Sequence, residues 1–75
     1  MGSIKNEKIL KAIAEYQEGL KQKENNQPNI ARVHFVRALR LLENAYRETR
    51  GYERIVAIKL FEEISRKMRE LEEIL

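Results

Sequence analysis

The chain has 75 residues, of which 36% are charged, with a net charge of +3, no cysteine and a single histidine. This length suits one domain near the lower limit at which an apolar core suffices, and the missing cysteines exclude disulfides and thiolate zinc sites. One histidine excludes multi-histidine metal clusters, whereas a magnesium or calcium site made only of carboxylates stays open. With one proline and three glycines, the composition favours long helices.

No apolar run is long enough to cross a membrane, and no signal peptide with a charged start and an apolar middle of ~7–15 residues is present. The sequence therefore predicts a soluble, cytoplasmic protein. We expect residues 1–75 to form a single domain. Its first residues, Met1-Gly2-Ser3, are either native or the remnant of an expression vector.

The first predicted helix runs from about residue 4 to residue 23, with Ser3 as its N-cap. Apolar residues recur in it at spacings of three and four, which is typical of a helix with one buried face. They are Ile9, Leu10, Ile13, Tyr16 and Leu20. Gly19 lies at the edge of this face, where it either lets a neighbouring backbone approach or is a tolerated surface glycine that costs ~1 kcal/mol relative to alanine.

A polar segment without apolar periodicity precedes Pro28, whose fixed φ and missing N–H suit the first turn of a helix. We therefore expect a second helix over residues 28–50, capped by Asn26 or Gln27. It ends where Gly51 offers the left-handed conformation that commonly follows a helix.

This second helix has two opposed faces. Its apolar residues fill about half of the circumference, more than one neighbouring helix would cover, so we expect the helix to lie between the other two. These residues are Ile30, Ala31, Phe35, Ala38, Leu39, Leu41, Leu42, Ala45 and Tyr46. His34 falls within the same arc, and we interpret it as a partly buried structural histidine, hydrogen-bonded to a neighbouring helix, rather than a catalytic or pH-sensing group.

The polar face of the second helix carries only arginine as its basic residue, and arginine favours bidentate contacts with carboxylate or phosphate. The arginines are Arg32, Arg37, Arg40, Arg47 and Arg50. In one interpretation Arg40 and Arg47 pair with Glu43 and with glutamates of the third helix on a solvated surface. In the other, the arginines contact a partner.

The third predicted helix runs over residues 52–75 after a very short connection. It has the most regular apolar face in the sequence, which consists of Val56, Ala57, Leu60, Phe61, Ile64, Met68, Leu71, Ile74 and Leu75. Ile55 and Ile58 project outside this face. We expect the Gly51 turn and the first helix to cover them, the alternative being an exposed apolar groove.

Three amphipathic helices with short connections predict an all-α, antiparallel three-helix bundle, with helices at about 4–23, 28–50 and 52–75. We expect modest stability, and association of copies through the remaining apolar surface stays open. The serines are Ser3 and Ser65 alone, and no glycine-rich phosphate loop is present. Adjacent glutamates on a helix point about 100° apart and do not share a substrate. We therefore predict no enzyme, no cofactor and no bound metal.

One series of residues runs through the second and third helices. It comprises Ala31, Phe35, Ala38-Leu39, Leu42 and Ala45, then Ile58-Lys59, then Ile64-Ser65-Arg66-Lys67-Met68 and Glu70-Leu71. This series resembles the MIT (microtubule-interacting and transport) domain, a three-helix bundle of this length that is related in shape to tetratricopeptide repeats. The resemblance implies a groove between helices that receives an amphipathic helix or an extended segment of a partner.

The resemblance also implies where such a partner would bind: in a groove of the third helix, with arginines of the second helix contacting acidic side chains of the ligand. The candidate residues are Arg37, Arg40, Arg47, Ile58, Phe61, Ser65 and Met68. We therefore predict a protein–protein interaction module that binds an acidic or amphipathic helix or peptide. One alternative is a small basic nucleic-acid-binding protein, against which the interleaved glutamates argue. Another is a structural or designed helical bundle, or an oligomerisation module, without a ligand of its own.

Overall fold

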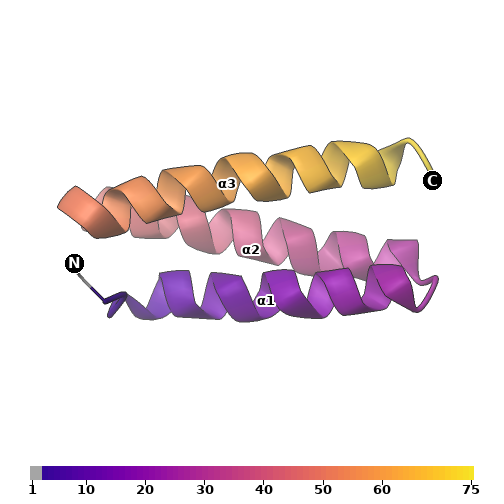
Figure 1. Cartoon of the computed structure of the whole chain (residues 1–75), viewed down its shortest axis with the longest axis horizontal. Coiled ribbons are helices and arrows are strands. Elements are labelled where there is room, and N and C mark those ends of the chain that lie inside the picture. Colours follow the sequence, from indigo (N-terminus) through magenta and orange to yellow (C-terminus); the bar gives the residue numbers. More distant parts are fainter. Residues whose placement is uncertain (1–2) are drawn as a thin grey trace.

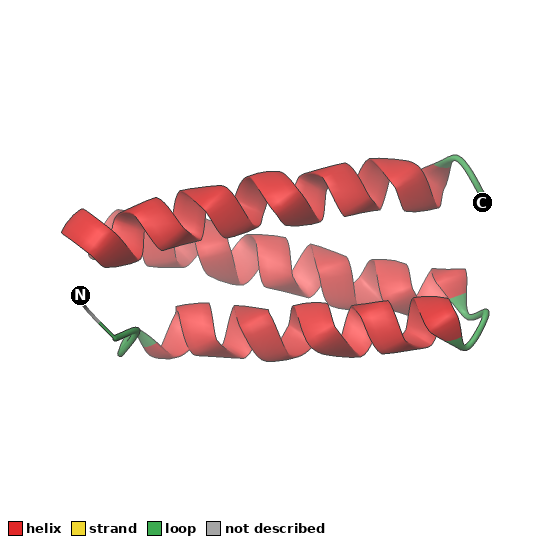
Figure 2. Cartoon of the chain, viewed as in Figure 1, coloured by secondary structure: helices red, strands yellow, loops and turns green. Residues whose placement is uncertain are grey.

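The computed structural model describes residues 3–75, which form three antiparallel helices joined by short loops (Figure 1, Figure 2). Helix α1 spans Glu7–Glu24, α2 spans Pro28–Glu48 and α3 spans Gly51–Glu72. The middle helix α2 packs against both others, whereas α1 and α3 make little direct backbone contact. The predicted fold class, an all-α antiparallel three-helix bundle with the second helix between the other two, is confirmed.

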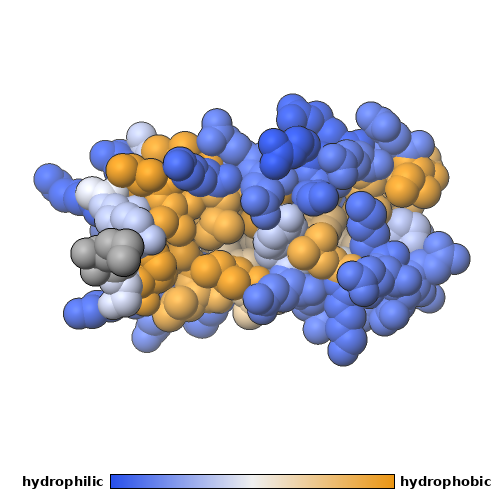
Figure 3. Space-filling view, viewed as in Figure 1, coloured by the Kyte–Doolittle hydropathy of each residue, from blue (hydrophilic) through white to orange (hydrophobic). Residues whose placement is uncertain are grey.

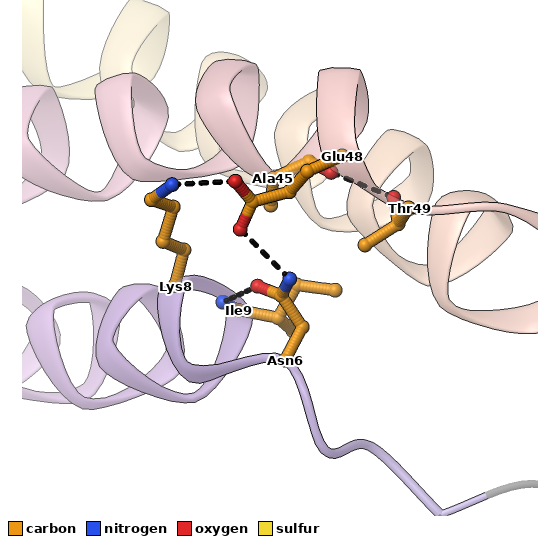
Figure 4. Close-up of polar contacts among 6 residues, drawn as sticks. All are labelled: Asn6, Lys8, Ile9, Ala45, Glu48 and Thr49. Atoms are coloured by element: carbon orange, nitrogen blue, oxygen red, sulfur yellow. Dashed lines mark hydrogen bonds and ion pairs between the residues drawn. The ribbon is translucent and has the colours of Figure 1, made fainter.

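Helix α1 begins at Glu7 because Asn6, and not Ser3, is its N-cap. Oδ1 of Asn6 accepts a hydrogen bond from the backbone N–H of Ile9 at 3.1 Å, which satisfies one of the free donors of the first turn. The Asn6 side-chain amide also donates to the carboxylate of Glu48 in α2 at 3.0 Å, and Nζ of Lys8 lies 2.6 Å from the other oxygen of that carboxylate (Figure 4). The prediction of Ser3 as the cap was wrong.

The segment before α1 is joined to α3 through Glu53. Its carboxylate accepts hydrogen bonds from the backbone N–H groups of Lys5 at 2.7 Å and Asn6 at 2.8 Å, and these bonds hold the pKa of Glu53 below its usual range. Hydrogen bonds from Lys8 and then Asn6 lower the pKa of Glu48 in the same way. The stability that these lowered pKa values contribute is present above about pH 4.5 and is lost as the pH falls through them.

Replacing Asn6 by alanine should lower the free energy of unfolding by about 1 kcal/mol, because the first turn of α1 loses its side-chain acceptor. Urea denaturation followed by circular dichroism measures this difference. The matched control is Asn44→Ala, at an exposed position within α2 that caps neither end of the helix. Equal losses in the two variants would contradict the capping role of Asn6.

Helix α1 ends in a Schellman motif. Asn26 adopts a left-handed conformation, with φ of 60°, which asparagine tolerates better than most residues. The backbone N–H of Gln27 donates to the carbonyl of Gln22 at 2.8 Å, and that of Asn26 donates to the carbonyl of Lys23 at 3.1 Å. Pro28 begins α2 as predicted, with Gln27 at the N-cap position, although no side chain caps this end of the helix.

Helix α2 ends at Glu48, and the connection to α3 differs from the predicted one. Thr49 is the C-cap residue, extended and buried, and its Oγ1 donates to the carbonyl of Ala45 at 2.7 Å (Figure 4). This bond satisfies a carbonyl that has no partner within the helix. Gly51 has the predicted left-handed conformation, with φ of 62°, but it is the first residue of α3 and does not terminate α2.

The core combines a few large side chains with many small ones, and the small residues allow the helices to approach closely. The buried apolar residues are Ile9, Ala12, Tyr16, Ala31, Phe35, Ala38, Leu42, Ala45, Ala57, Ile64 and Leu71. Gly19 is buried among them. A Cβ atom at Gly19 would lie 2.5 Å from Cε1 of Phe35 and 3.3 Å from the carbonyl oxygen of Ala31, so packing requires glycine at this position.

The face between α1 and α3 keeps apolar surface accessible. Because these two helices make little direct contact, apolar side chains are visible between them in the space-filling view, mainly towards the end at which α1 begins (Figure 3). Even so, none of the helices in the described part of the chain is long and apolar enough to cross a membrane.

Candidate functional site

A cavity of about 320 Å³ opens between α2 and α3. Each helix contributes two adjacent rows of side chains, at positions i, i+1, i+4 and i+5, which lie on one side of a helix. The lining residues are Leu42, Glu43, Tyr46 and Arg47 from α2, and Ala57, Ile58, Phe61 and Glu62 from α3. We call this cavity and its rim the α2–α3 groove.

The α2–α3 groove has a buried apolar floor and partly exposed apolar walls. Leu42 and Ala57 are buried, whereas the side chains of Tyr46 and Ile58 are each 41% exposed. Ile55, which does not line the cavity, is 53% exposed on the same helix. The expectation that the Gly51 turn and the first helix cover Ile55 and Ile58 is therefore wrong. The reason is that α1 packs mainly on α2 and does not reach the outer side of α3.

The Tyr46 wall is held in place by Arg54. The guanidinium carbon of Arg54 lies 4.0 Å from the centroid of the Tyr46 ring, which is the geometry of a cation–π contact. Nε of Arg54 is buried and has no hydrogen-bond partner in the described chain, so the ring is the contact that the structure provides for this cation. Tyr46 was predicted as part of the apolar arc, but its role as a groove wall was missed.

The rim of the α2–α3 groove carries charges of both signs, because Arg47 lies near Glu43 and Glu62. Among residues 3–75, neither Arg40 nor Arg47 forms a salt bridge. The interpretation in which both arginines pair with neighbouring glutamates is therefore wrong.

The predicted site residues that border a hollow fall on two separate surfaces. Arg47, Ile58 and Phe61 line the α2–α3 groove. Arg37 and Arg40 instead border a hollow next to α1, together with Lys11, Ala14, Glu15 and Leu41.

The remaining two candidates lie further along α3. Ser65 and Met68 are half-buried, and Met68 packs against the core. Neither lines the cavity. The residues that the sequence predicted to form one site are therefore divided: three line the α2–α3 groove, and Arg37 and Arg40 form a separate group beside α1.

His34 is half-buried between α1 and α2. Its Nδ1 lies 2.6 Å from Oε1 of Glu15, so the ring and the carboxylate link the two helices. This arrangement confirms the prediction of a partly buried histidine that is hydrogen-bonded to a neighbouring helix.

Within residues 3–75, no three His, Asp or Glu side chains come close enough together to hold a metal ion. No protein-family model, curated protein or solved structure matches the chain. The likeness to the MIT domain stays a prediction based on the residues of α2 and α3.

Proposed function

We propose that the chain is a non-enzymatic interaction module that binds an amphipathic helix of a partner protein in the α2–α3 groove. The observation that carries this proposal is the pair of partly exposed side chains, Tyr46 and Ile58, above the buried floor of Leu42 and Ala57. Binding would remove this apolar surface from water, at ~25 cal/mol for each Å² buried.

The size and rigidity of the groove suit a side chain of a partner. Its volume of about 320 Å³ lies at the lower end of the ~300–1,000 Å³ typical of ligand pockets, which favours an apolar anchor residue over a large cofactor. The contact of Arg54 with Tyr46 fixes one wall before binding, so less conformational entropy is lost on association.

The rim defines the charges that the partner helix would carry. Apolar residues of the partner at spacings of three and four would contact Ile58 and Phe61, the helix-in-groove mode of recognition. An acidic residue of the partner would meet Arg47, and basic residues would meet Glu43 on the same rim and Glu62 on the α3 rim. We therefore propose a partner helix of mixed charge for this groove.

Replacing Ile58 by aspartate should weaken binding by at least about tenfold, because a charge would occupy the centre of the apolar surface. The measurement is an NMR titration of the labelled chain with a panel of synthetic amphipathic peptides. We expect shift changes at Leu42, Tyr46 and Phe61, and an unchanged helical content of the variant by circular dichroism, since Ile58 is 41% exposed.

The matched control is Ile55→Asp, which makes the same chemical change on the same helix outside the groove and should leave the affinity nearly unchanged. Equal losses of affinity in both variants would contradict the proposal, and so would a loss of helical content in Ile58→Asp. A third contradicting result concerns self-association. If the chain sediments at a multiple of 8.9 kDa and Ile58→Asp is monomeric, the groove is an interface between copies.

A further inference from the structure

The outer side of α2 forms a second surface, which borders α1 at Arg37 and Arg40. At about 100° per residue, Asn29, Val33, Val36 and Arg40 follow one another at spacings of four, three and four, and so form one row along the helix. Arg37 and Asn44 lie beside this row. Five of these side chains are exposed and that of Val36 is half-buried, and the row lies opposite the buried face of α2. We call these six residues the arginine stripe.

The arginine stripe has no carboxylate of its own, although Glu43, which lines the α2–α3 groove, follows Arg40 by three residues. Glu15 of α1 contacts His34 at 2.6 Å, and Glu48 contacts Lys8 at the same distance. In the described chain, Arg37 and Arg40 form no salt bridge. Two exposed guanidinium groups are therefore available to an anionic partner.

The centre of the arginine stripe is apolar. Val33 is 47% exposed, and together with Val36 it forms a shallow apolar surface bordered by Asn29, Arg32, Arg37 and Arg40 of the same helix. Val33 and Val36 are three residues apart, which is one step of the apolar spacing by which a helix receives another helix, and charged residues flank them.

Three occupants can be compared on charge and chemistry. A second copy would bring arginines against arginines, which is unfavourable at short distance. A nucleic acid would find guanidinium groups for its phosphates, but the stripe contains no aromatic side chain for bases to stack on, and the valines would remain without a contact. An acidic amphipathic helix would complement both the valines and the arginines.

We propose that the arginine stripe is a docking surface for an acidic amphipathic helix of another protein, distinct from the α2–α3 groove. Apolar side chains of that helix lie on Val33 and Val36, and its flanking carboxylates bind Arg37 and Arg40. None of the six stripe residues lines the groove, so the two sites are lost independently of each other on mutation.

The test is fluorescence anisotropy with a synthetic helical peptide of about three heptads, with leucine at positions a and d and glutamate at e and g. A companion peptide carries lysine at e and g. The glutamate peptide should bind and the lysine peptide should not. Arg37→Glu/Arg40→Glu should weaken binding by at least about tenfold, and Arg37→Gln/Arg40→Gln by a smaller factor. Val33→Ser should also weaken it, because the apolar contact is lost.

The matched control is Arg66→Glu/Arg69→Glu, an identical change of net charge at exposed positions of α3, which should retain binding. Ile58→Asp should retain it as well, which separates this surface from the α2–α3 groove. Equal weakening in the control would overturn the proposal, because net charge alone would then explain binding. It would also be overturned if single-stranded or duplex DNA bound more tightly than the glutamate peptide and Val33→Ser had no effect, since the stripe would then be a phosphate-binding surface.

Discussion

Phe35→Ala should lower the free energy of unfolding by about 3–5 kcal/mol, the cost typical of removing a buried aromatic side chain. The ring of Phe35 is fully buried in the core, and its centroid lies 5.7 Å from that of Tyr16, with 53° between the ring planes. A domain of this length has a stability of roughly 4–11 kcal/mol, at ~0.05–0.15 kcal/mol per residue. The substitution therefore removes a large share of it, and urea denaturation measures the loss.

A substitution at Gly19 tests the packing of the Phe35 ring directly, because Gly19 contacts that ring. In the wild-type chain, Gly19→Ala brings a Cβ atom to 2.5 Å from Phe35, and such overpacking costs ~1–3 kcal/mol. In the Phe35→Ala background the same methyl group enters space left by the ring, and alanine gains up to ~1 kcal/mol in helix propensity over glycine. The effect of Gly19→Ala should therefore change sign between the two backgrounds.

A double-mutant cycle measures this coupling. Ala14→Gly, at an exposed position of the same helix, supplies the difference in helix propensity without a packing change. Gly19→Ala with the same sign and size in both backgrounds would contradict the contact between Gly19 and Phe35.

A second large effect is expected at high pH, where the stability should fall by roughly 2–3 kcal/mol between pH 10 and pH 12. The pKa of Tyr16 is raised from 10.0 to about 12, chiefly by burial and then by the Glu63 carboxylate nearby. Because the raised pKa belongs to the folded state, the stability is complete below pH 10 and is lost as the pH rises through about 12. The size follows from ~1.4 kcal/mol for each unit of pKa shift.

Tyr16→Phe keeps the packed ring and removes the hydroxyl, so this variant should lose the part of the alkaline decline that belongs to Tyr16. The free energy of unfolding is measured in guanidinium chloride at several pH values. Tyr46→Phe, at an exposed tyrosine, is the matched control and should decline like the wild type. An unchanged decline in Tyr16→Phe would show that other groups cause it.

The three helices and their order could be predicted because the pattern that specifies them is local. Apolar spacing of three and four sets each buried face, and Pro28 fixes the start of α2 through its own backbone. The width of the apolar arc of α2 also predicted its middle position, since this arc must meet two neighbours. These inferences use only residues within a few turns of one another.

The start of α1 could not be predicted from local sequence alone, because it depends on residues that are distant in the chain. Ser3 and Asn6 are both good N-cap residues, and the choice of Asn6 involves Glu48 and Glu53, which are distant in sequence. The end of α2 is set by a local contact, since the hydroxyl of Thr49 donates to the carbonyl of Ala45 four residues earlier. The sequence alone indicated only that Gly51 would adopt a left-handed conformation.

The candidate site was predicted in part. The helical wheel places Arg37, Arg40 and Arg47 on one polar arc of α2. It does not determine which of these arginines lie next to α1 and which lie next to α3. The structure places Arg47 at the edge of α3 and Arg37 beside α1. The exposure of Ile58 could not be predicted for the same reason, since the position of α1 determines which side of α3 stays uncovered.

The two ends of the described chain lie at opposite ends of a bundle about 36 Å long (Figure 1). A polypeptide joined to both ends would enter at one tip and leave at the other, so the bundle would act as a rigid spacer between its neighbours. Both proposed surfaces run along the sides of α2 and leave the tips free. Copies linked in tandem would therefore present these surfaces at regular intervals along a rod, and a partner with repeated helices could bind several of them with increased avidity.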